Sequence, residues 1–185
     1  LPMSAIMGPN MADQATGVFW GAFTLFACTT ASILSGAVIE RIRMASFVVL
    51  AVILGSVVWN LAASWGWHPA GWLVTNYGYH DAVASGVVHT ISGFFALGVL
   101  INLGPRIGKF NADGSANQIR GHSLPMTITG LMLIVVGFFG FIGACVLYNY
   151  GVGGGWTNIY GGPTTLSAYL FNTLMAVAGG IIGCY

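Results

Sequence analysis

Charged residues are nearly missing from this sequence. Its 185 residues include five Lys or Arg and four Asp or Glu, which together make 5% of the chain. That is about a fifth of the share in a typical soluble domain. A chain with so little charge cannot cover a water-facing surface, which excludes a soluble globular protein. A net charge of +1 is too small to hold a polyanion, so we expect no nucleic acid partner.

Cysteine is also scarce, and its distribution excludes several kinds of site. Cys28, Cys145 and Cys184 all lie inside apolar runs and form no CxxC motif. The pattern indicates small buried hydrophobic residues rather than a disulfide framework or a zinc site. A single histidine inside the spans cannot form a haem or metal site, which needs two or more ligands. We therefore expect no metal and no cofactor.

Apolar residues, at 56% of the chain, are the abundant class. A bilayer core is crossed by roughly 20 apolar helical residues. Five windows meet this requirement, at about residues 16–39, 44–65, 82–103, 124–147 and 167–185. The sequence therefore predicts an all-α fold, a polytopic membrane helix bundle with five transmembrane helices.

The basic residues predict the orientation of these spans. All of them lie after the first window or between the third and fourth: Arg41, Arg43, Arg106, Lys109 and Arg120. The other two connections, 66–81 and 148–166, contain none. Under the positive-inside rule the basic connections are cytoplasmic, so the first span runs from outside to inside. We expect a multi-pass protein of the cell membrane.

The two ends of the sequence suggest a larger protein. The first residue is Leu1, and Tyr185 directly follows an apolar run. We expect residues 1–185 to be one partial transmembrane domain of a longer membrane protein.

Ionisable groups at membrane depth are costly, so each is a candidate functional residue. Asp81, Ser85 and His89 are spaced four apart at the start of the third window, which favours one helical face. At helical rise His89 would lie roughly 12 Å below Asp81. Asp81 is a candidate helix cap, and such a cap does not exclude a role at the mouth of a pathway. His89 is either a core histidine satisfied by a neighbouring helix or a group lining a passage.

Aromatic residues mark both the spans and the outer connections. Phe19, Phe23 and Phe26 follow one face of the first window, and Phe138, Phe139 and Phe141 lie in the fourth. They indicate either helix packing or a barrier that excludes water above His89. Tryptophan and tyrosine in the outer connections indicate an interfacial belt or an aromatic vestibule that attracts cations. Composition alone does not choose between these alternatives.

Several short motifs occur together in chain order. They are SGAVIERIR at 35–43, WHPAGWL at 67–73, DAVASGVVH at 81–89, HSLP at 122–125, GFFGF at 137–141 and FNT at 171–173. In this set and order the sequence resembles the Amt/Mep/Rh ammonium transporter family. The resemblance covers about residues 19–173 and corresponds to the third through seventh of that family's eleven helices.

The resemblance implies roles for individual residues. Trp67 and Phe19 would line an outer site that receives ammonium through cation–π contact. Phe23 and Phe141 would form a stacked aromatic gate. Asp81 would support the outer site, and His89 would be the first of two histidines lining the pore.

The sequence departs from the family in three respects. The second pore histidine belongs to a later helix that this chain does not contain. Cys145 stands where the family usually has a serine that hydrogen-bonds the ion in the substrate site, and a thiol is a weaker partner. Ile142 replaces an asparagine after the gate phenylalanine. The last two changes bear on affinity and on substrate handling.

The resemblance implies an ammonium transporter or channel rather than an enzyme, with ammonium or methylammonium as substrate. It further implies a homotrimer in the lipid bilayer and leaves a cytoplasmic regulatory protein open as a partner. Two alternatives remain at this point. One is an ammonium sensor with little net transport, coupled to a signalling domain. The other is a membrane oxidoreductase subunit, which would require further paired histidines.

Overall fold

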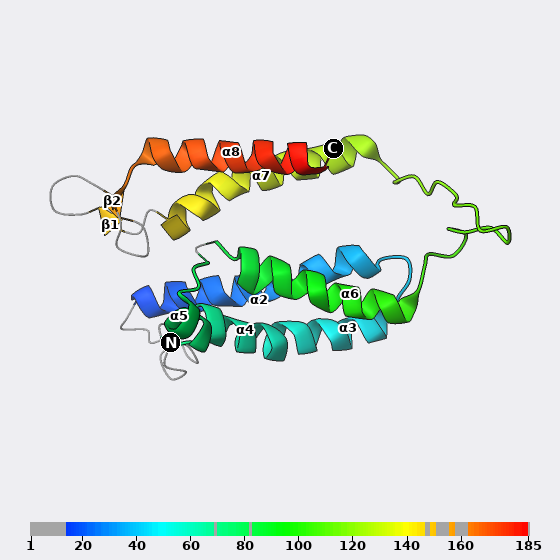
Figure 1. The fold of residues 1–185 in the computed structure, drawn as a ribbon, viewed down its shortest axis with the longest axis horizontal. Coiled ribbons are helices and arrows are strands. Elements are labelled where there is room, and N and C mark those ends of the chain that lie inside the picture. The colour runs from blue at the N-terminus through cyan, green and yellow to red at the C-terminus, as the bar shows by residue number, and fades with distance from the viewer. Residues whose placement is uncertain are drawn as a thin grey trace. The chain divides into compact units, whose positions relative to one another are not determined.

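A computed structural model describes residues 14–68, 70–81, 83–146, 149–150, 156–157 and 163–184. The chain divides into two compact units, within residues 1–119 and 120–185 (Figure 1). In the described part of the chain, five helical segments are long and apolar enough to cross a membrane: Trp20–Val38, Met44–Gly66, Ser85–Leu103, Leu124–Gly143 and Leu166–Cys184. The predicted helix bundle is therefore confirmed, with each window within a few residues of its span.

The first unit contains three of the spans and one short helix. Its elements are α2 (Gln14–Val38), α3 (Met44–Ile53), η1 (Leu54–Val58), α4 (Trp59–Gly66), α5 (Trp72–Tyr77), η2 (Ser85–Thr90) and α6 (Ile91–Leu103). The segments α3, η1 and α4 form one continuous span, as do η2 and α6. The spans lie side by side in Figure 1, with α6 against α2. The sequence analysis did not predict three of these elements: the π-helical segments η1 and η2 and the short helix α5.

The spans of the first unit pack through apolar and small polar side chains. Leu34, Val38, Leu54 and Ala96 form a buried cluster between α2, η1 and α6. Ser92 is fully buried, and its hydroxyl donates to the carbonyl oxygen of Thr30 at 2.6 Å, which links α6 to α2. Small residues and such hydrogen bonds hold helices together where lipid removes the hydrophobic driving force.

The third span begins later than the sequence predicted. We expected a helix from residue 82, but helical geometry starts at Ser85. Ala84, directly before it, has a left-handed backbone with φ 72°. Asp81 therefore precedes the helix, and the expectation that Asp81, Ser85 and His89 share one helical face is wrong for Asp81. The distance of 12 Å derived from helical rise does not apply either.

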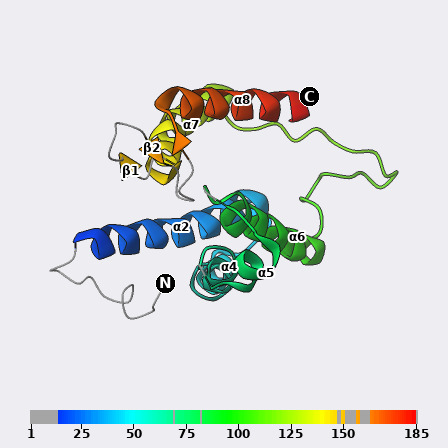
Figure 2. The same cartoon turned by 60° about the vertical axis from the view of Figure 1, so that its left-hand side comes forward.

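The second unit contains α7 (Leu124–Val146) and α8 (Leu166–Cys184), which contact each other and cross in Figure 2. Their connection includes three short antiparallel strands in the order β1 (Asn149–Tyr150), β2 (Trp156–Thr157) and β3 (Pro163–Thr164). The buried Tyr169 of α8 donates its hydroxyl to the carbonyl oxygen of Phe139 on α7. This bond fixes the two helices against each other.

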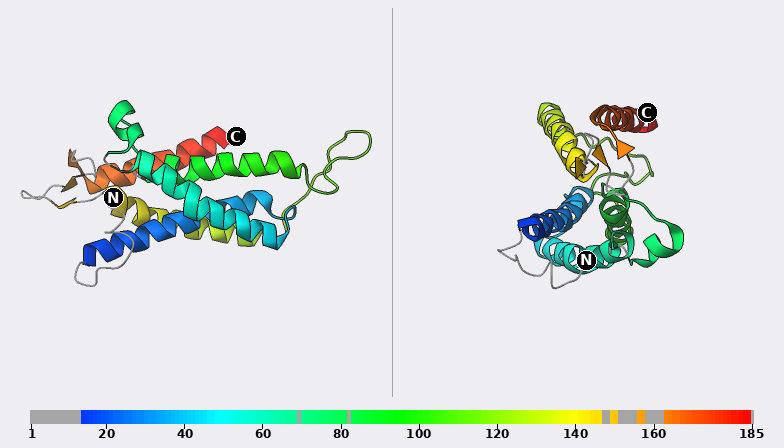
Figure 3. Two further views of the ribbon diagram at one scale, coloured as in Figure 1. Left: turned by 90° about the horizontal axis from the view of Figure 1, so that it is seen from below. Right: turned by 90° about the vertical axis from the view of Figure 1, so that its left-hand side faces the viewer.

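The connection after α6 extends past the helix ends, and α5 stands off the end of α4 (Figure 3). Gly104, with φ 74°, ends α6, and Pro105 follows it. Asp113 in this connection accepts hydrogen bonds from the hydroxyl and the backbone N–H of Ser115. These bonds hold the pKa of the Asp113 carboxyl below its ordinary value.

Candidate functional site

The indole of Trp67 is fixed in place by a hydrogen bond to the backbone. Trp67 lies at the carboxyl end of α4, and its Nε1 donates to the carbonyl oxygen of Asp81 at 2.7 Å. The intervening chain forms α5 and returns to the start of η2. One end of the second span is thereby tied to the beginning of the third.

The side chain of Asp81 organises the start of η2. It is 4% exposed, and its carboxylate accepts backbone N–H bonds from Ser85, Gly86 and Val87 at 3.0, 2.9 and 2.8 Å. These groups are among the first-turn donors that have no partner within a helix. Asp81 is therefore a capping group, as one of its two sequence interpretations proposed. The bonds offset the strain of Ala84, since a left-handed L-residue costs about 1–2 kcal/mol.

Three aromatic rings lie close to that of Trp67. Its ring centroid lies 5.7 Å from Phe23, 4.9 Å from Phe26 and 6.3 Å from Trp59. Phe23 also contacts Phe26 and Trp59, each with centroids 6.3 Å apart. We call Phe23, Phe26, Trp59 and Trp67 the aromatic cluster. It joins α2 to the second span at the end where Asp81 lies.

A separate chain of aromatic rings faces outward. Trp65 contacts Trp72, and Trp72 contacts Tyr77, each with centroids 5.9 Å apart. These three side chains are 44%, 45% and 75% exposed, as expected of an interfacial belt. The structure thus separates the belt from the aromatic cluster, a distinction that composition could not make.

His89 lies on η2 with its side chain exposed, while the adjacent Val87 and Val88 are buried. Its backbone N–H bonds to the carbonyl oxygen of Ala84, five residues earlier, which is the spacing of a π-helix. Such π segments occur often at functional sites. Within the described part of the first unit, His89 is therefore not packed as a core histidine.

Comparison with known proteins supplies the family. A model of the Ammonium Transporter Family matches residues 5–185. The chain belongs to the ammonium transporter family. This membership confirms the resemblance inferred from the motifs and makes the chain part of a multi-pass membrane protein.

Several curated proteins of this family are similar to the chain. Ammonium transporter Amt2 of Archaeoglobus fulgidus is 34% identical over 138 residues, covering 70% of this chain and 29% of that protein. Ammonium transporter Amt1 of Methanocaldococcus jannaschii is 31% identical over 171 residues, covering 92% of this chain and 40% of that protein. Ammonium transporter 1 member 3 of Solanum lycopersicum is 35% identical over 123 residues, covering 63% of this chain and 27% of that protein. The chain therefore spans well under half the length of these family members.

Some of the predicted family site residues lie in other parts of the chain. Phe141 is half-buried on α7 of the second unit, with its ring centroid 5.8 Å from that of Phe138. The side chains of Phe19 and Cys145 lie outside the described residues. The stacking of Phe23 with Phe141 and the contribution of Cys145 to the substrate site stay predictions.

Two residues of the site were missed from the sequence. Trp59 is 4% exposed and belongs to the aromatic cluster. Its spacing of eight residues from Trp67 on one helix was a signal that could have found it. The Tyr79 hydroxyl lies 3.4 Å from Asp81 Oδ2, a local contact between residues two apart in the chain.

No group of three His, Cys, Asp or Glu side chains could hold a metal ion among the residues that the structure describes. His68 Nδ1 accepts the backbone N–H of Ala70 at 3.0 Å, which shapes the turn before α5.

Proposed function

We propose that the protein containing this chain transports ammonium across the cell membrane. The observation that carries the proposal is the fixed indole of Trp67 at the aromatic cluster, next to the Asp81 cap that positions η2 and His89. Family membership and the names of the similar proteins support the substrate.

Trp67, at the aromatic cluster, would form the outer recruitment site together with Phe19. Aromatic faces attract cations through the ring quadrupole, with about 0.5–2 kcal/mol per contact depending on desolvation. In the proposal Trp67 and Phe19 present their faces to the ion, and Cys145 supplies a weak polar contact. Phe19 precedes Phe23 by four residues on α2, so the two lie on one face of that helix.

The proposed pore selects ammonium by its chemistry. Ammonium and potassium ions are similar in size, so a cavity cannot readily separate them. A bare cation is far more costly than a neutral amine in a dry passage, and only ammonium can lose a proton to become one. A gate of Phe23 and Phe141 would exclude water, and the imidazole of His89 would accept or relay the proton. The second pore histidine would come from a part of the protein outside this chain.

The proposal includes a homotrimer of the complete protein in the lipid bilayer. The described spans leave many apolar side chains exposed, for example Phe94, Ile101 and Ile182 at 71%, 75% and 76%. Such surfaces are suited to lipid, to further spans of the same protein or to other copies in a homotrimer. Chemical cross-linking of the complete protein in membranes tests the last, and a ladder ending at the trimer is expected.

The role of His89 is tested by methylammonium uptake in cells that express the complete protein. We expect His89→Leu to reduce uptake strongly, because leucine cannot accept or relay a proton in the passage. His122→Leu is the matched control, since His122 is exposed in the connection before α7 and should be neutral. Uptake by His89→Leu equal to that of wild type would contradict the pore role. Ammonium binding without uptake by the wild-type protein would favour the sensor.

Trp67→Leu tests the outer site. We expect the apparent KM for methylammonium to rise roughly two- to thirtyfold, the equivalent of the loss of one cation–π contact, with a smaller change in maximal uptake. Trp72→Leu is the control, because Trp72 belongs to the exposed aromatic belt. An unchanged concentration dependence in Trp67→Leu would remove Trp67 from the outer site.

A further inference from the structure

The indole N–H of Trp59 is a buried donor without an acceptor. Trp59 is 4% exposed, and its Nε1 has no hydrogen-bond partner within the described part of the chain. The indole carries this one polar atom, and the atom can only donate. A buried donor that has given up water without gaining an acceptor is destabilising. We therefore expect the group to meet an acceptor in the working protein.

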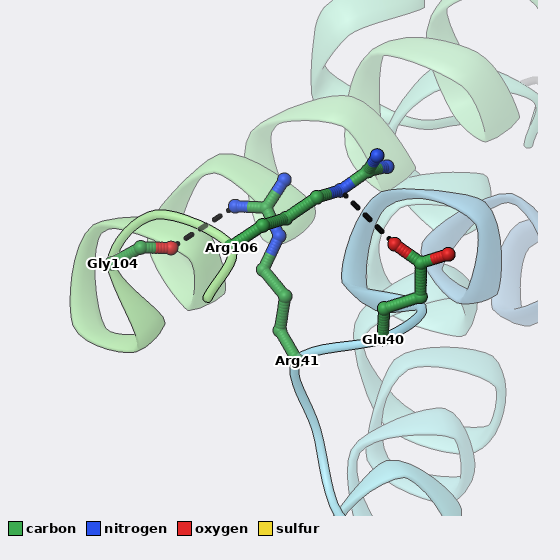
Figure 4. A network of polar contacts seen from close by, with 4 residues as sticks. All are labelled: Glu40, Arg41, Gly104 and Arg106. Atoms are coloured by element: carbon green, nitrogen blue, oxygen red, sulfur yellow. Dashed lines mark hydrogen bonds and ion pairs between the residues drawn. The ribbon is translucent and has the colours of Figure 1, made fainter. Parts of the chain in front are cut away.

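Two arginine nitrogen atoms share this condition, but their side chains have other contacts. The Nε atoms of Arg41 and Arg106 are also buried without a hydrogen bond among the described residues. Arg41 still donates through Nη1 to the carbonyl oxygen of Gly104 at 3.0 Å (Figure 4). Arg106 Nε lies 3.6 Å from Glu40 Oε2, which makes an ion pair (Figure 4). The indole of Trp59 has no second polar atom that could compensate in this way.

Trp59 lies near the proposed gate and near the residues that lead to His89. It begins α4, eight residues before Trp67, so its backbone lies roughly 12 Å deeper in the span. Its ring centroid is 6.3 Å from that of Phe23, the proposed gate residue on α2. It shares one buried cluster with Val88, which directly precedes His89 on η2.

The neighbours of Trp59 in this cluster offer it little. The polar atoms of Trp67 and Tyr79, which pack against the same cluster, bind Asp81 instead. The rings of Phe23 and Trp67 present aromatic faces, which accept an N–H group only weakly. We therefore expect the acceptor to come from outside the described residues, either from another part of the complete protein or from a molecule in the passage.

The chemistry of the donor separates the species that could reach it. Neither ammonium nor a potassium ion can accept a hydrogen bond, whereas neutral ammonia has a lone pair that can. Ammonia forms when one N–H bond of ammonium breaks. The electron pair stays on nitrogen, and the proton passes to an acceptor, which in the proposed function is the imidazole of His89. A fixed N–H donor therefore favours the deprotonated substrate over either cation.

We propose that the indole N–H of Trp59 donates a hydrogen bond to the nitrogen lone pair of the neutral amine in the passage. Trp59 is then a binding residue that selects the deprotonated substrate. The inference rests on the proposed ammonium transport and adds a specificity-determining contact to it. The aromatic faces at Trp67 attract the cation, and the edge of Trp59 holds the neutral amine.

The first test observes the indole directly in the complete protein. Solid-state NMR records the indole signals of isotope-labelled tryptophan in lipid bilayers. The Trp59 signal is assigned by its loss when Trp59 is replaced by benzothienylalanine, in which sulfur takes the place of the indole N–H group. Spectra with ammonium chloride and with potassium chloride are compared at neutral and mildly alkaline pH, because free ammonia increases with pH.

We expect the Trp59 signal to shift with ammonium, to shift further at alkaline pH, and to stay in place with potassium. The Trp65 signal is the internal control, since Trp65 is 44% exposed on the same helix. Equal shifts in the two salts would overturn the proposal and assign the acceptor to water. A Trp59 signal that neither salt moves would overturn it too, since the acceptor would then be another part of the protein.

The second test measures methylammonium uptake after the donor has been removed and the ring kept. We expect benzothienylalanine at the position of Trp59 to lower maximal uptake roughly three- to tenfold, the equivalent of one lost hydrogen bond. The KM should change by less than about twofold, because the outer site that receives the cation is intact. The same replacement of Trp65 is the matched control. Wild-type maximal uptake by the Trp59 variant, or equal losses in both variants, would contradict the proposal.

The two tests distinguish this inference from the transport proposal. If the wild-type protein takes up no methylammonium, transport is rejected, and the NMR signal still decides whether Trp59 binds the amine. If the wild type transports and its Trp59 signal is unmoved by ammonium, the Trp59 contact is rejected and transport stands. Thermal unfolding checks the variant. If it melts early, Trp59→Phe provides the assignment, and the NMR comparison on the wild-type protein decides.

Discussion

At the scale of single residues, Asp81 performs two tasks with different atoms. Its carbonyl oxygen accepts the indole N–H of Trp67, and its carboxylate accepts three backbone N–H groups of η2. Buried carboxylates are stable only when hydrogen bonds or charges compensate their desolvation. One buried residue therefore holds both the tryptophan of the proposed outer site and the segment that carries His89.

Replacing Asp81 by Asn tests this role. The amide has one acceptor oxygen and an NH₂ group that would face backbone donors. We therefore expect a loss of about 1–3 kcal/mol in stability and a higher KM for methylammonium. Thermal unfolding of the purified protein measures the first and uptake the second. Asp113→Asn is the control, because Asp113 lies in the exposed connection after α6. Equal melting temperatures for Asp81→Asn and wild type would show that the cap contributes nothing.

At the scale of elements, the spans of the first unit approach closely where small residues face a neighbouring backbone. A Cβ built on Gly55 would lie 3.2 Å from the carbonyl oxygen of Ala27 on α2. Gly55 belongs to η1, the π segment just before Trp59. The closeness of the two helices at this point allows the rings of Phe23 and Trp59 to meet in the aromatic cluster.

Gly55→Leu should separate α2 from the second span. Overpacking of this kind costs about 1–3 kcal/mol, and here it would act on backbone that cannot move aside. Gly98→Leu on α6 is the control, since no atom lies within 4 Å of a Cβ at that position. Thermal unfolding in detergent is the measurement, with a lower melting temperature expected for Gly55→Leu alone. Similar melting of both variants would refute the close contact as a source of stability.

At the scale of the whole molecule, the basic residues and the order of spans predict which connections face the cytoplasm. In the first unit, the ends of α2 and α6 that carry Arg41 and Gly104 lie together, as two spans running in the same direction require. Trp67 and Asp81 meet at the other end. The contacts within this unit agree with the alternating topology.

Labelling with a membrane-impermeant thiol reagent tests the topology. In a background with Cys28, Cys145 and Cys184 replaced by Ala, Asn76→Cys in α5 should react in intact cells. Ser115→Cys, in the connection after α6, should react only after permeabilisation. The reverse pattern would contradict the predicted orientation, and the same triple-alanine protein without an introduced cysteine reports background labelling.

The sequence by itself determined the number of spans, their positions and the distribution of basic residues between connections. These properties depend on hydropathy and charge along the chain, which need no knowledge of neighbours in space. Its motifs also indicated the family, which the comparison confirmed. Hydropathy along the chain placed the start of the third span too early. The pattern of apolar residues does not reveal that Asp81 caps the helix or that Ala84 has a left-handed backbone.

Only the tertiary structure decided which aromatic residues act together and which distant groups form hydrogen bonds. Trp67 meets Asp81 across 14 residues, and Arg41 meets Gly104 across 63, so their pairing depends on how the spans pack. Trp59 joined the aromatic cluster because α2 lies against the second span. Long-range contacts are set by packing geometry, and a one-dimensional pattern holds too little information to fix them.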